Sequence, residues 1–179
     1  VATNTLRVAR NAKEFLRLGE QRLGFPIEVI AGREEARLIY FGVAHLLAAG
    51  SARRLIVDIG GGSTELAVGT GYTPELVESI YTGCVSASLQ FFRDDIYDKG
   101  AFKQAELAAR HLIEPVAKSM RDAGWSEVIG SSGTARAIAD LLEANAFSER
   151  GITAEGLDRL RAALIKAGRG SVLRLEALK

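Results

Sequence analysis

The chain has 179 residues, 47% hydrophobic and 25% charged, a composition typical of a soluble globular protein. Its 23 Lys and Arg residues nearly balance its 22 Asp and Glu residues, so a basic groove for nucleic acid is not expected. The single cysteine, Cys84, excludes an internal disulfide and a zinc site built on several cysteines, which fits a reducing cytoplasm.

No stretch of the sequence predicts stable membrane insertion. The longest apolar-looking segment, Leu38 to Ala49, is too short to span a bilayer and contains His45. There is no signal-peptide pattern at the start, so a cytoplasmic location is expected. The chain opens at Val1 directly into a structured motif, which indicates a piece of a longer protein.

The first 30 residues combine a helical and an extended pattern. Apolar residues at helical spacing predict one helix after the opening Thr3–Arg7, and Gly24 with Pro26 should end it. The residues Ile27–Ile30 then alternate like a short strand.

A second helix is expected from about Arg33 to Ala48, with an apolar stripe along one face. Glu34 and Glu35 fall in its first turn, where acidic residues complement the helix dipole. On these residues alone, dipole complementation and solvation explain both acids.

The most informative stretch is residues 55–69. Two short apolar runs flank Gly60-Gly61-Gly62, which predicts strand, tight turn, strand. Consecutive glycines leave backbone N–H groups uncovered, so an anion can bind them. Asp58 and Glu65 would place two carboxylates beside that anion. We therefore predict a phosphate and Mg²⁺ site, with an ordinary hairpin carrying two solvated acids as the alternative.

The middle of the chain predicts a third strand over Leu76–Tyr81, and hence an antiparallel or mixed sheet. A short helix is expected over Val85–Phe92, preceded by Cys84, which we interpret as a buried small residue. Three acids near Gly100 fail the calcium-loop spacing and are interpreted as a solvated loop: Asp94, Asp95 and Asp98.

Two further helices are expected. The first runs from about Phe102 to Asp122, and Pro115 should kink or split it. His111 on that helix is expected at the surface, because no acid–nucleophile pattern surrounds it. The second opens at Gly151–Thr153 and ends at Gly168–Gly170.

A second anion-type loop follows a short strand that starts near Trp125. The loop is Gly130-Ser131-Ser132-Gly133-Thr134, and a helix continues over Ala135–Leu142. A glycine-bearing loop at a helix N-terminus is a ready anion site. The alternative is a plain strand-to-helix turn with Ser and Thr capping, which the presence of the glycine hairpin in the same chain disfavours.

Two common phosphate motifs do not fit the sequence. Gly-Lys-Ser/Thr does not occur, which excludes a P-loop nucleoside triphosphatase. The dinucleotide fingerprint requires a third glycine where this chain has Glu65, and a helix where this chain returns as a strand. Asp-x-Gly-Gly-Gly-Ser-Thr-Glu in a hairpin instead resembles the second phosphate-binding motif of the sugar kinase/Hsp70/actin superfamily.

Five motifs in order narrow this resemblance to the exopolyphosphatase/guanosine pentaphosphate phosphohydrolase (Ppx/GppA) family. They are Thr3–Arg7, Gly32–Tyr40, Asp58–Leu66, Gly83–Ser86 and Gly130–Thr134. The resemblance implies an α/β fold of the actin-like ATPase, sugar kinase and Hsp70 type (ribonuclease H-like), present in part. It implies that residues 1–31 end the first lobe, and that residues 32–179 form a C-terminally incomplete second lobe carrying the hairpin.

The activity that the resemblance implies is hydrolysis of a terminal phosphoanhydride of inorganic polyphosphate, or of the 5′ γ-phosphate of guanosine pentaphosphate. By matching positions, Glu35 would be the general base that orients the attacking water, with Glu34 as the alternative if the register shifts by one. Arg7 and Thr5 would lie at the cleft and neutralise the phosphate chain.

The resemblance also implies Mg²⁺ as the cofactor, with Asp58 and Glu65 to hold it. Phosphate oxygens would be bound by two sets of residues: Gly60, Gly61, Gly62, Ser63 and Thr64 in the hairpin, and Ser131, Ser132, Gly133 and Thr134 in the second loop. Phosphoryl transfer suits such a set because it depends on positioning and charge neutralisation. A homodimer is the implied assembly.

Two other functions stay open. A polyphosphate- or alarmone-binding sensor that no longer hydrolyses would use the same residues. An ATP-dependent kinase of the same superfamily would share the hairpin, although Glu35 and the full motif set speak against it. The family's N-terminal Asp-x-Gly-Ser-x-Ser loop does not occur in this chain, so half of the phosphate clamp is missing and the isolated piece is not expected to be active.

Overall fold

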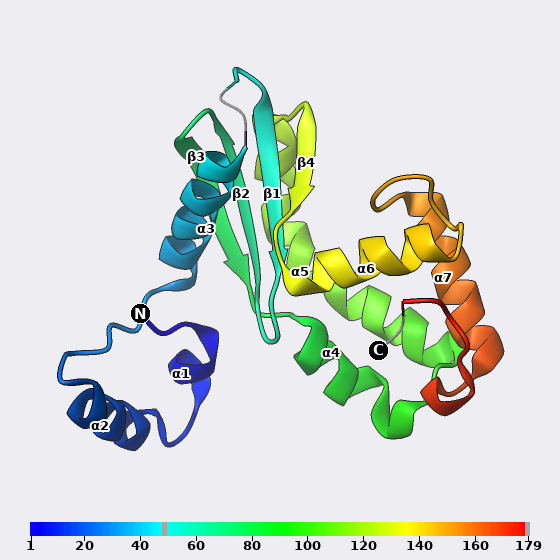
Figure 1. Ribbon diagram of the computed structural model, residues 1–179, viewed down its shortest axis with the longest axis horizontal. Helices are drawn as coiled ribbons and strands as arrows, with labels where there is room; N and C mark the ends of the chain where they lie inside the picture. Colours follow the sequence, from blue (N-terminus) through cyan, green and yellow to red (C-terminus); the bar gives the residue numbers. More distant parts are fainter. Residues whose placement is uncertain (48–49, 178–179) are drawn as a thin grey trace.

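The computed structural model describes residues 1–47 and 50–177. Its centre is a four-stranded sheet in the order β3-β2-β1-β4 (Figure 1). β1 (Arg53–Ile59) pairs antiparallel with β2 (Thr64–Thr70), which pairs antiparallel with β3 (Thr73–Ile80). β4 (Glu127–Gly130) pairs parallel with β1, so the sheet is mixed.

One face of the sheet is covered by α3 (Gly32–Leu46) (Figure 1). The buried α3 residues recur every four positions, which places them on one stripe of the helix: Ala36, Tyr40 and Ala44. Tyr40 and Ala44 pack on Ile56 of β1 and Ala67 of β2 to form the core. This packing fixes the first turn of α3 at the end of the sheet where β1 turns into β2.

The opposite face of the sheet lies on the side of the helices that follow β3 in the chain. These are α4 (Cys84–Phe91), α5 (Lys99–Ala123), α6 (Gly133–Ala144) and α7 (Ala154–Ala167), with short 3₁₀ turns at Arg93–Asp95 and Gly170–Val172. Side chains of β1 and β2 that point away from α3 line an open apolar pocket of about 570 Å³, and residues of α5 line it as well.

The N-terminal segment is not the single helix predicted. It forms α1 (Asn4–Val8) and α2 (Ala12–Leu23), because the backbone is extended at Ala9 (ψ 130°). α2 ends at Gly24 in the left-handed conformation, as predicted. The strand predicted over Ile27–Ile30 is wrong: Val29 makes only an isolated parallel bridge with Ala2.

The structure tests three predictions for the middle of the chain. Cys84 is exposed rather than buried, because it is the first residue of α4. Pro115 does not split α5, which loses one backbone hydrogen bond there and keeps helical turns on both sides. The acids of the loop, Asp94, Asp95 and Asp98, are exposed, as predicted, and the Asp98 side chain caps α5 by accepting from the Ala101 N–H at 2.8 Å.

Other element boundaries lie within a few residues of the prediction. α3 begins at Gly32 and ends at Leu46, and Ala48, its predicted end, lies outside the described residues. α7 starts after its Thr153 cap and ends at Gly168, as predicted. No helix in the described part of the chain has the length and apolarity needed to cross a membrane.

Candidate functional site

The predicted glycine turn joins β1 to β2. Asp58 and Glu65 are cross-strand partners, so their side chains leave the same face of the sheet. The Gly60 N–H donates to the Ser63 carbonyl at 2.9 Å and closes the turn. Within residues 1–47 and 50–177, the N–H groups of Gly61 and Gly62 have no acceptor. The turn therefore carries free amide donors next to two carboxylates.

The first turn of α4 donates hydrogen bonds to the backbone carbonyls of the glycine turn. The Gly60 and Gly61 carbonyls accept 2.9–3.0 Å hydrogen bonds from three N–H groups of the first turn of α4: those of Cys84, Val85 and Ser86. A Cβ on Gly83 would lie 2.5 Å from the Gly60 oxygen, so a residue with a side chain would not fit at position 83. The hydrogen bonds and the close contact hold the turn in one conformation.

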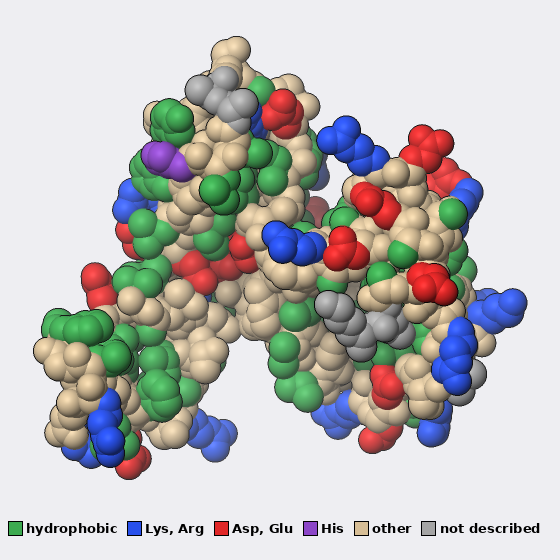
Figure 2. Space-filling model, in the orientation of Figure 1, with side chains coloured by type: hydrophobic (Ala, Val, Ile, Leu, Met, Phe, Trp, Pro, Cys, Tyr) green, Lys and Arg blue, Asp and Glu red, His purple; other side chains and the backbone are tan. Residues whose placement is uncertain are grey.

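The carboxylate of Glu65 is almost completely buried, at 3% exposure for the residue. Burial raises the pKa of Glu65, hydrogen bonds from Ser79 and Ser63 lower it, and the nearby carboxylates of Glu35 and Asp58 raise it further. Three acids from α3, β1 and β2 therefore lie within electrostatic reach of one another, and Figure 2 shows acidic side chains gathered where α3 meets the sheet.

Arg7 of α1 reaches across to Glu35. Its Nη1 donates to Glu35 Oε2 at 3.0 Å and to the Ile30 carbonyl at 2.8 Å. Its Nη2 also lies 3.0 Å from Glu35 Oε2, an ion-pair distance without hydrogen-bond geometry. In the described structure, Nε and Nη2 of Arg7 are buried and have no hydrogen-bond partner, so the guanidinium is held against Glu35 with two of its donor atoms unsatisfied.

Glu34 lies differently from its neighbour. Both of its oxygens accept from Arg37, at 2.8 and 2.6 Å, one turn along the same helix. That hydrogen bonding lowers the pKa of Glu34, and its side chain is 41% exposed. The structure brings Glu35, and not Glu34, into contact with Arg7.

The second predicted loop contacts the first through Asp58. Ser131 Oγ donates to Asp58 Oδ2 at 2.5 Å. Ser132 Oγ accepts from the Ile59 N–H at 3.2 Å and from the Ala135 N–H at 3.1 Å, so it caps α6. This loop therefore orients one carboxylate of the site.

The remaining predicted phosphate ligands are divided between the turn and its surroundings. Thr64 and Thr134 line the apolar pocket, and Thr64 donates to the Thr82 carbonyl at 2.7 Å. Gly133 is an exposed first residue of α6, and Thr5 is exposed on α1. Their predicted roles stay predictions.

The donor set suits Mg²⁺. Among the described residues, no cluster of three or more His, Cys, Asp and Glu is arranged to hold a metal ion. Mg²⁺ needs fewer protein ligands, because one or two carboxylates with water and substrate phosphates complete its shell. Asp58 and Glu65 supply two carboxylates, and a cation there would offset the charge buried beside Glu35.

Three contacts at the site are not predicted by the sequence. Ser79 Oγ donates to Glu65 Oε1 at 2.8 Å. A Cβ on Gly32 would lie 2.6 Å from the Ser79 Cβ, and a Cβ on Gly62 would overlap the Asn4 amide. The strand register could have indicated Ser79, since it is the cross-strand partner of Glu65, but a single sequence does not state that register.

Comparison with known proteins identifies the family. The model of the Ppx/GppA phosphatase family matches residues 1–179. A PPX-GPPA enzyme from Aquifex aeolicus is 32% identical, with a TM-score of 0.63 over 79% of this chain and 45% of that chain. An exopolyphosphatase-like protein is 30% identical, with a TM-score of 0.70 over 79% of this chain and 46% of that chain.

Another solved structure shares the fold over nearly the whole of this chain. An exopolyphosphatase from Cytophaga hutchinsonii is 22% identical, with a TM-score of 0.80 over 99% of this chain and 59% of that chain. The chain thus spans about half the length of the solved structures that it matches. Its mixed α/β fold, which the sequence predicted, is shared with these solved structures. The chain belongs to the Ppx/GppA phosphatase family.

Proposed function

We propose that the whole protein hydrolyses terminal phosphoanhydride bonds of inorganic polyphosphate with Mg²⁺. The observation that carries this proposal is the meeting of three carboxylates, Glu35, Asp58 and Glu65, at a turn with free amide donors. Membership of a phosphatase family and likeness to proteins named exopolyphosphatase-like support it.

In this mechanism Glu35 orients a water molecule for attack on the terminal phosphorus. The new bond joins the water oxygen to phosphorus, and the bond that breaks joins phosphorus to the bridging oxygen. The bridging oxygen leaves with the electron pair on the shortened polyphosphate, while the water proton passes to the Glu35 carboxylate. Positioning and charge neutralisation supply most of the catalysis in such a reaction.

The other residues hold these groups in place. Arg7 orients Glu35, and its positive charge would help to neutralise the phosphate chain. The amides of Gly61 and Gly62 would bind a phosphate oxygen. Ser131 orients Asp58.

Mg²⁺, when bound by Asp58 and Glu65, would neutralise charge on the phosphate oxygens. Its place beside these two acids is part of the proposal. The carboxylate of Glu65 lies buried next to Glu35, so the cation and the base would work on the same phosphate group.

The experiment is a phosphate-release assay on the whole protein with long-chain polyphosphate and Mg²⁺, repeated after chelation of the metal. We expect release of single phosphates that stops on chelation. Guanosine pentaphosphate is assayed in parallel, because the same chemistry applies to its 5′ γ-phosphate. Tight binding of polyphosphate without any phosphate release would contradict hydrolysis and support the sensor; substrate-dependent ADP formation from ATP would support the kinase.

A further inference from the structure

Ser79 of β3 lies at the site. Strand pairing uses only its backbone, so the pairing does not explain why a hydroxyl side chain is found here. Ser79 is the cross-strand partner of Glu65, and its Oγ donates to Glu65 Oε1 at 2.8 Å. Glu65 has almost no access to water, so this hydrogen bond replaces one that solvent would otherwise make. The hydroxyl therefore determines which way one oxygen of Glu65 faces.

The same serine contacts Gly32, the first residue of α3. A Cβ on Gly32 would overlap the Ser79 Oγ and lie 2.6 Å from its Cβ, so the helix can begin here only with glycine. Glu35 follows Gly32 by three residues, about one helical turn. The contact between Gly32 and Ser79 thus limits how far Glu35 can lie from Glu65.

We propose that Ser79 is a positioning residue for the reaction proposed above: its hydroxyl orients Glu65, and its close contact with Gly32 sets the separation between Glu65 and Glu35. The inference rests on the proposed function, because Glu65 matters here as a ligand for the metal. Ser79 itself touches no reacting atom.

A purely structural role predicts different behaviour. If Ser79 only satisfied a buried carboxylate, removing its hydroxyl would lower stability and leave the remaining folded molecules as active as before. A positioning role predicts a lower kcat in folded protein, with KM for polyphosphate nearly unchanged, because the phosphate-binding amides remain in place.

The test is a double-mutant cycle in the whole protein between Ser79→Ala and Glu65→Ala. Two quantities are measured: kcat for phosphate release from polyphosphate, and the affinity for Mg²⁺ alone by calorimetry. Thr70→Ala is the matched control, since the Thr70 hydroxyl also donates across the β2–β3 hairpin, to Glu75 Oε1 at 3.1 Å, but at the other end of the strands. Thermal melting confirms that each variant is folded under assay conditions.

We expect Ser79→Ala to lower kcat by about 10- to 100-fold with KM within about threefold, and to weaken Mg²⁺ binding, whereas Thr70→Ala matches the wild type. In the Glu65→Ala background, Ser79→Ala should have no further effect. Wild-type kcat and Mg²⁺ affinity in Ser79→Ala, or an equal loss with and without Glu65, overturns the inference. Gly32→Ala is the second variant and should lower kcat as well.

Failure of the proposed function gives a separate result. A wild-type protein that releases no phosphate contradicts the hydrolase proposal. The Mg²⁺ titrations of wild type, Ser79→Ala and Thr70→Ala then test the role of Ser79 by themselves. Weaker Mg²⁺ binding in Ser79→Ala than in Thr70→Ala supports the positioning role; equal binding overturns it.

Discussion

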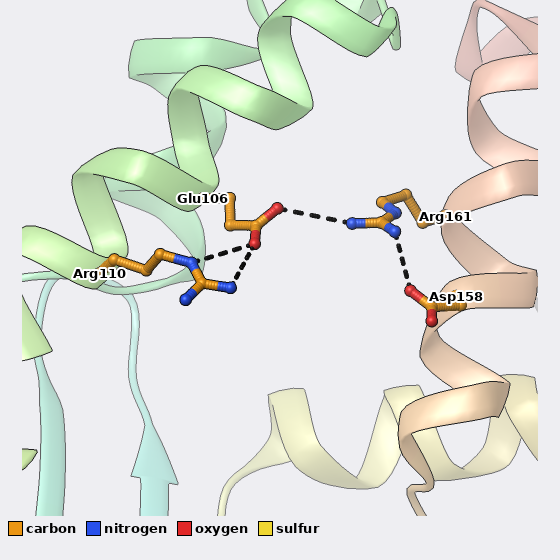
Figure 3. Close-up of polar contacts among 4 residues, drawn as sticks. All are labelled: Glu106, Arg110, Asp158 and Arg161. Atoms are coloured by element: carbon orange, nitrogen blue, oxygen red, sulfur yellow. Dashed lines mark hydrogen bonds and ion pairs between the residues drawn. The ribbon is translucent and has the colours of Figure 1, made fainter.

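At the glycine turn, backbone segments approach so closely that single methyl groups would not fit, whereas α5 and α7 meet through exposed charged side chains. Gly83 lies against the backbone of Gly60, and Gly32 lies against the side chain of Ser79. By contrast, Glu106 of α5 accepts from Arg110 at 2.8 Å and lies 3.5 Å from Arg161 of α7, which also donates to Asp158 at 2.8 Å (Figure 3).

The difference shows where the sequence of this molecule is constrained. Close-packed backbone has no room to adjust, so the end of the sheet that carries the acids depends on particular glycines. Exposed ion pairs contribute little to stability and tolerate change. Substitutions at the turn should therefore have much larger effects than substitutions between α5 and α7.

Apart from substitution of Glu35, the largest effect is expected from Asp58→Asn in the whole protein. Removing one of the two carboxylates proposed for Mg²⁺ should lower the rate of phosphate release by about 10²- to 10³-fold, the usual scale for loss of one electrostatic group in an active site. The measurement is initial-rate phosphate release over a range of Mg²⁺ concentrations. A rate within threefold of wild type would remove Asp58 from the site.

Gly83→Ala should be the most damaging of the glycine substitutions. Its methyl group would meet the Gly60 and Gly61 backbone at 2.5–2.6 Å, and overpacking of this kind costs about 1–3 kcal/mol of unfolding free energy. Urea unfolding measures the loss. Gly42→Ala is the matched control: it lies in α3 with no atom within 4 Å of the added methyl, so it should stabilise by about 0.5–1 kcal/mol. Equal losses in both variants would contradict the close-contact argument.

Glu65→Gln should stabilise the metal-free protein at pH 7. The fold raises the pKa of Glu65 above the ordinary value of 4.5, chiefly through burial, so the folded chain favours the protonated form and the charged form lowers stability. Glutamine removes that cost, and we expect a gain on the order of 1 kcal/mol.

The pH dependence checks the sign of this effect. The gain should be present at neutral pH, shrink as the pH falls through the folded-state pKa, and disappear below 4.5, where the carboxyl is protonated in both folded and unfolded chains. Thermal melts with a chelator present, from pH 7 to pH 4, measure it. A gain that grows as the pH falls would show that burial does not raise the pKa of Glu65.

The smallest effect is expected from Glu106→Ala. Hydrogen bonding from Arg110 lowers the pKa of Glu106, but both partners are exposed, and the contact is screened by salt. The unfolding midpoint should be indistinguishable from wild type at physiological salt. A clear destabilisation that salt does not remove would mean that the α5–α7 contact is as constrained as the turn.

The parts of the site that the sequence predicted are those encoded by neighbouring residues. The hairpin around Gly60–Gly62 follows from two β-forming runs with glycines between them, and the acidic first turn of α3 follows from helical spacing. The catalytic and binding roles assigned to these residues stay predictions, as do the lobe boundary at residue 31, the homodimer and the cytoplasmic location.

The contacts that the sequence did not predict join residues far apart in the chain. Arg7 and Glu35 are 28 positions apart, and Ser131 and Asp58 are 73 apart. Periodicity does not indicate which helix face meets which strand, so the pairing of Arg7 with Glu35 rather than Glu34 follows only from the packing. For the same reason the sequence predicts a buried Cys84, whereas this residue starts α4 and is exposed.

The most direct test of the central claim compares Glu35→Gln with Glu34→Gln in the whole protein, using kcat for phosphate release from polyphosphate with saturating Mg²⁺. Both substitutions remove one charge from the same helical turn, but only Glu35 contacts Arg7 and lies near Glu65. We predict a loss of several orders of magnitude for Glu35→Gln, in line with removal of a general base, and a far smaller loss for Glu34→Gln. Near-normal turnover in Glu35→Gln would contradict the account.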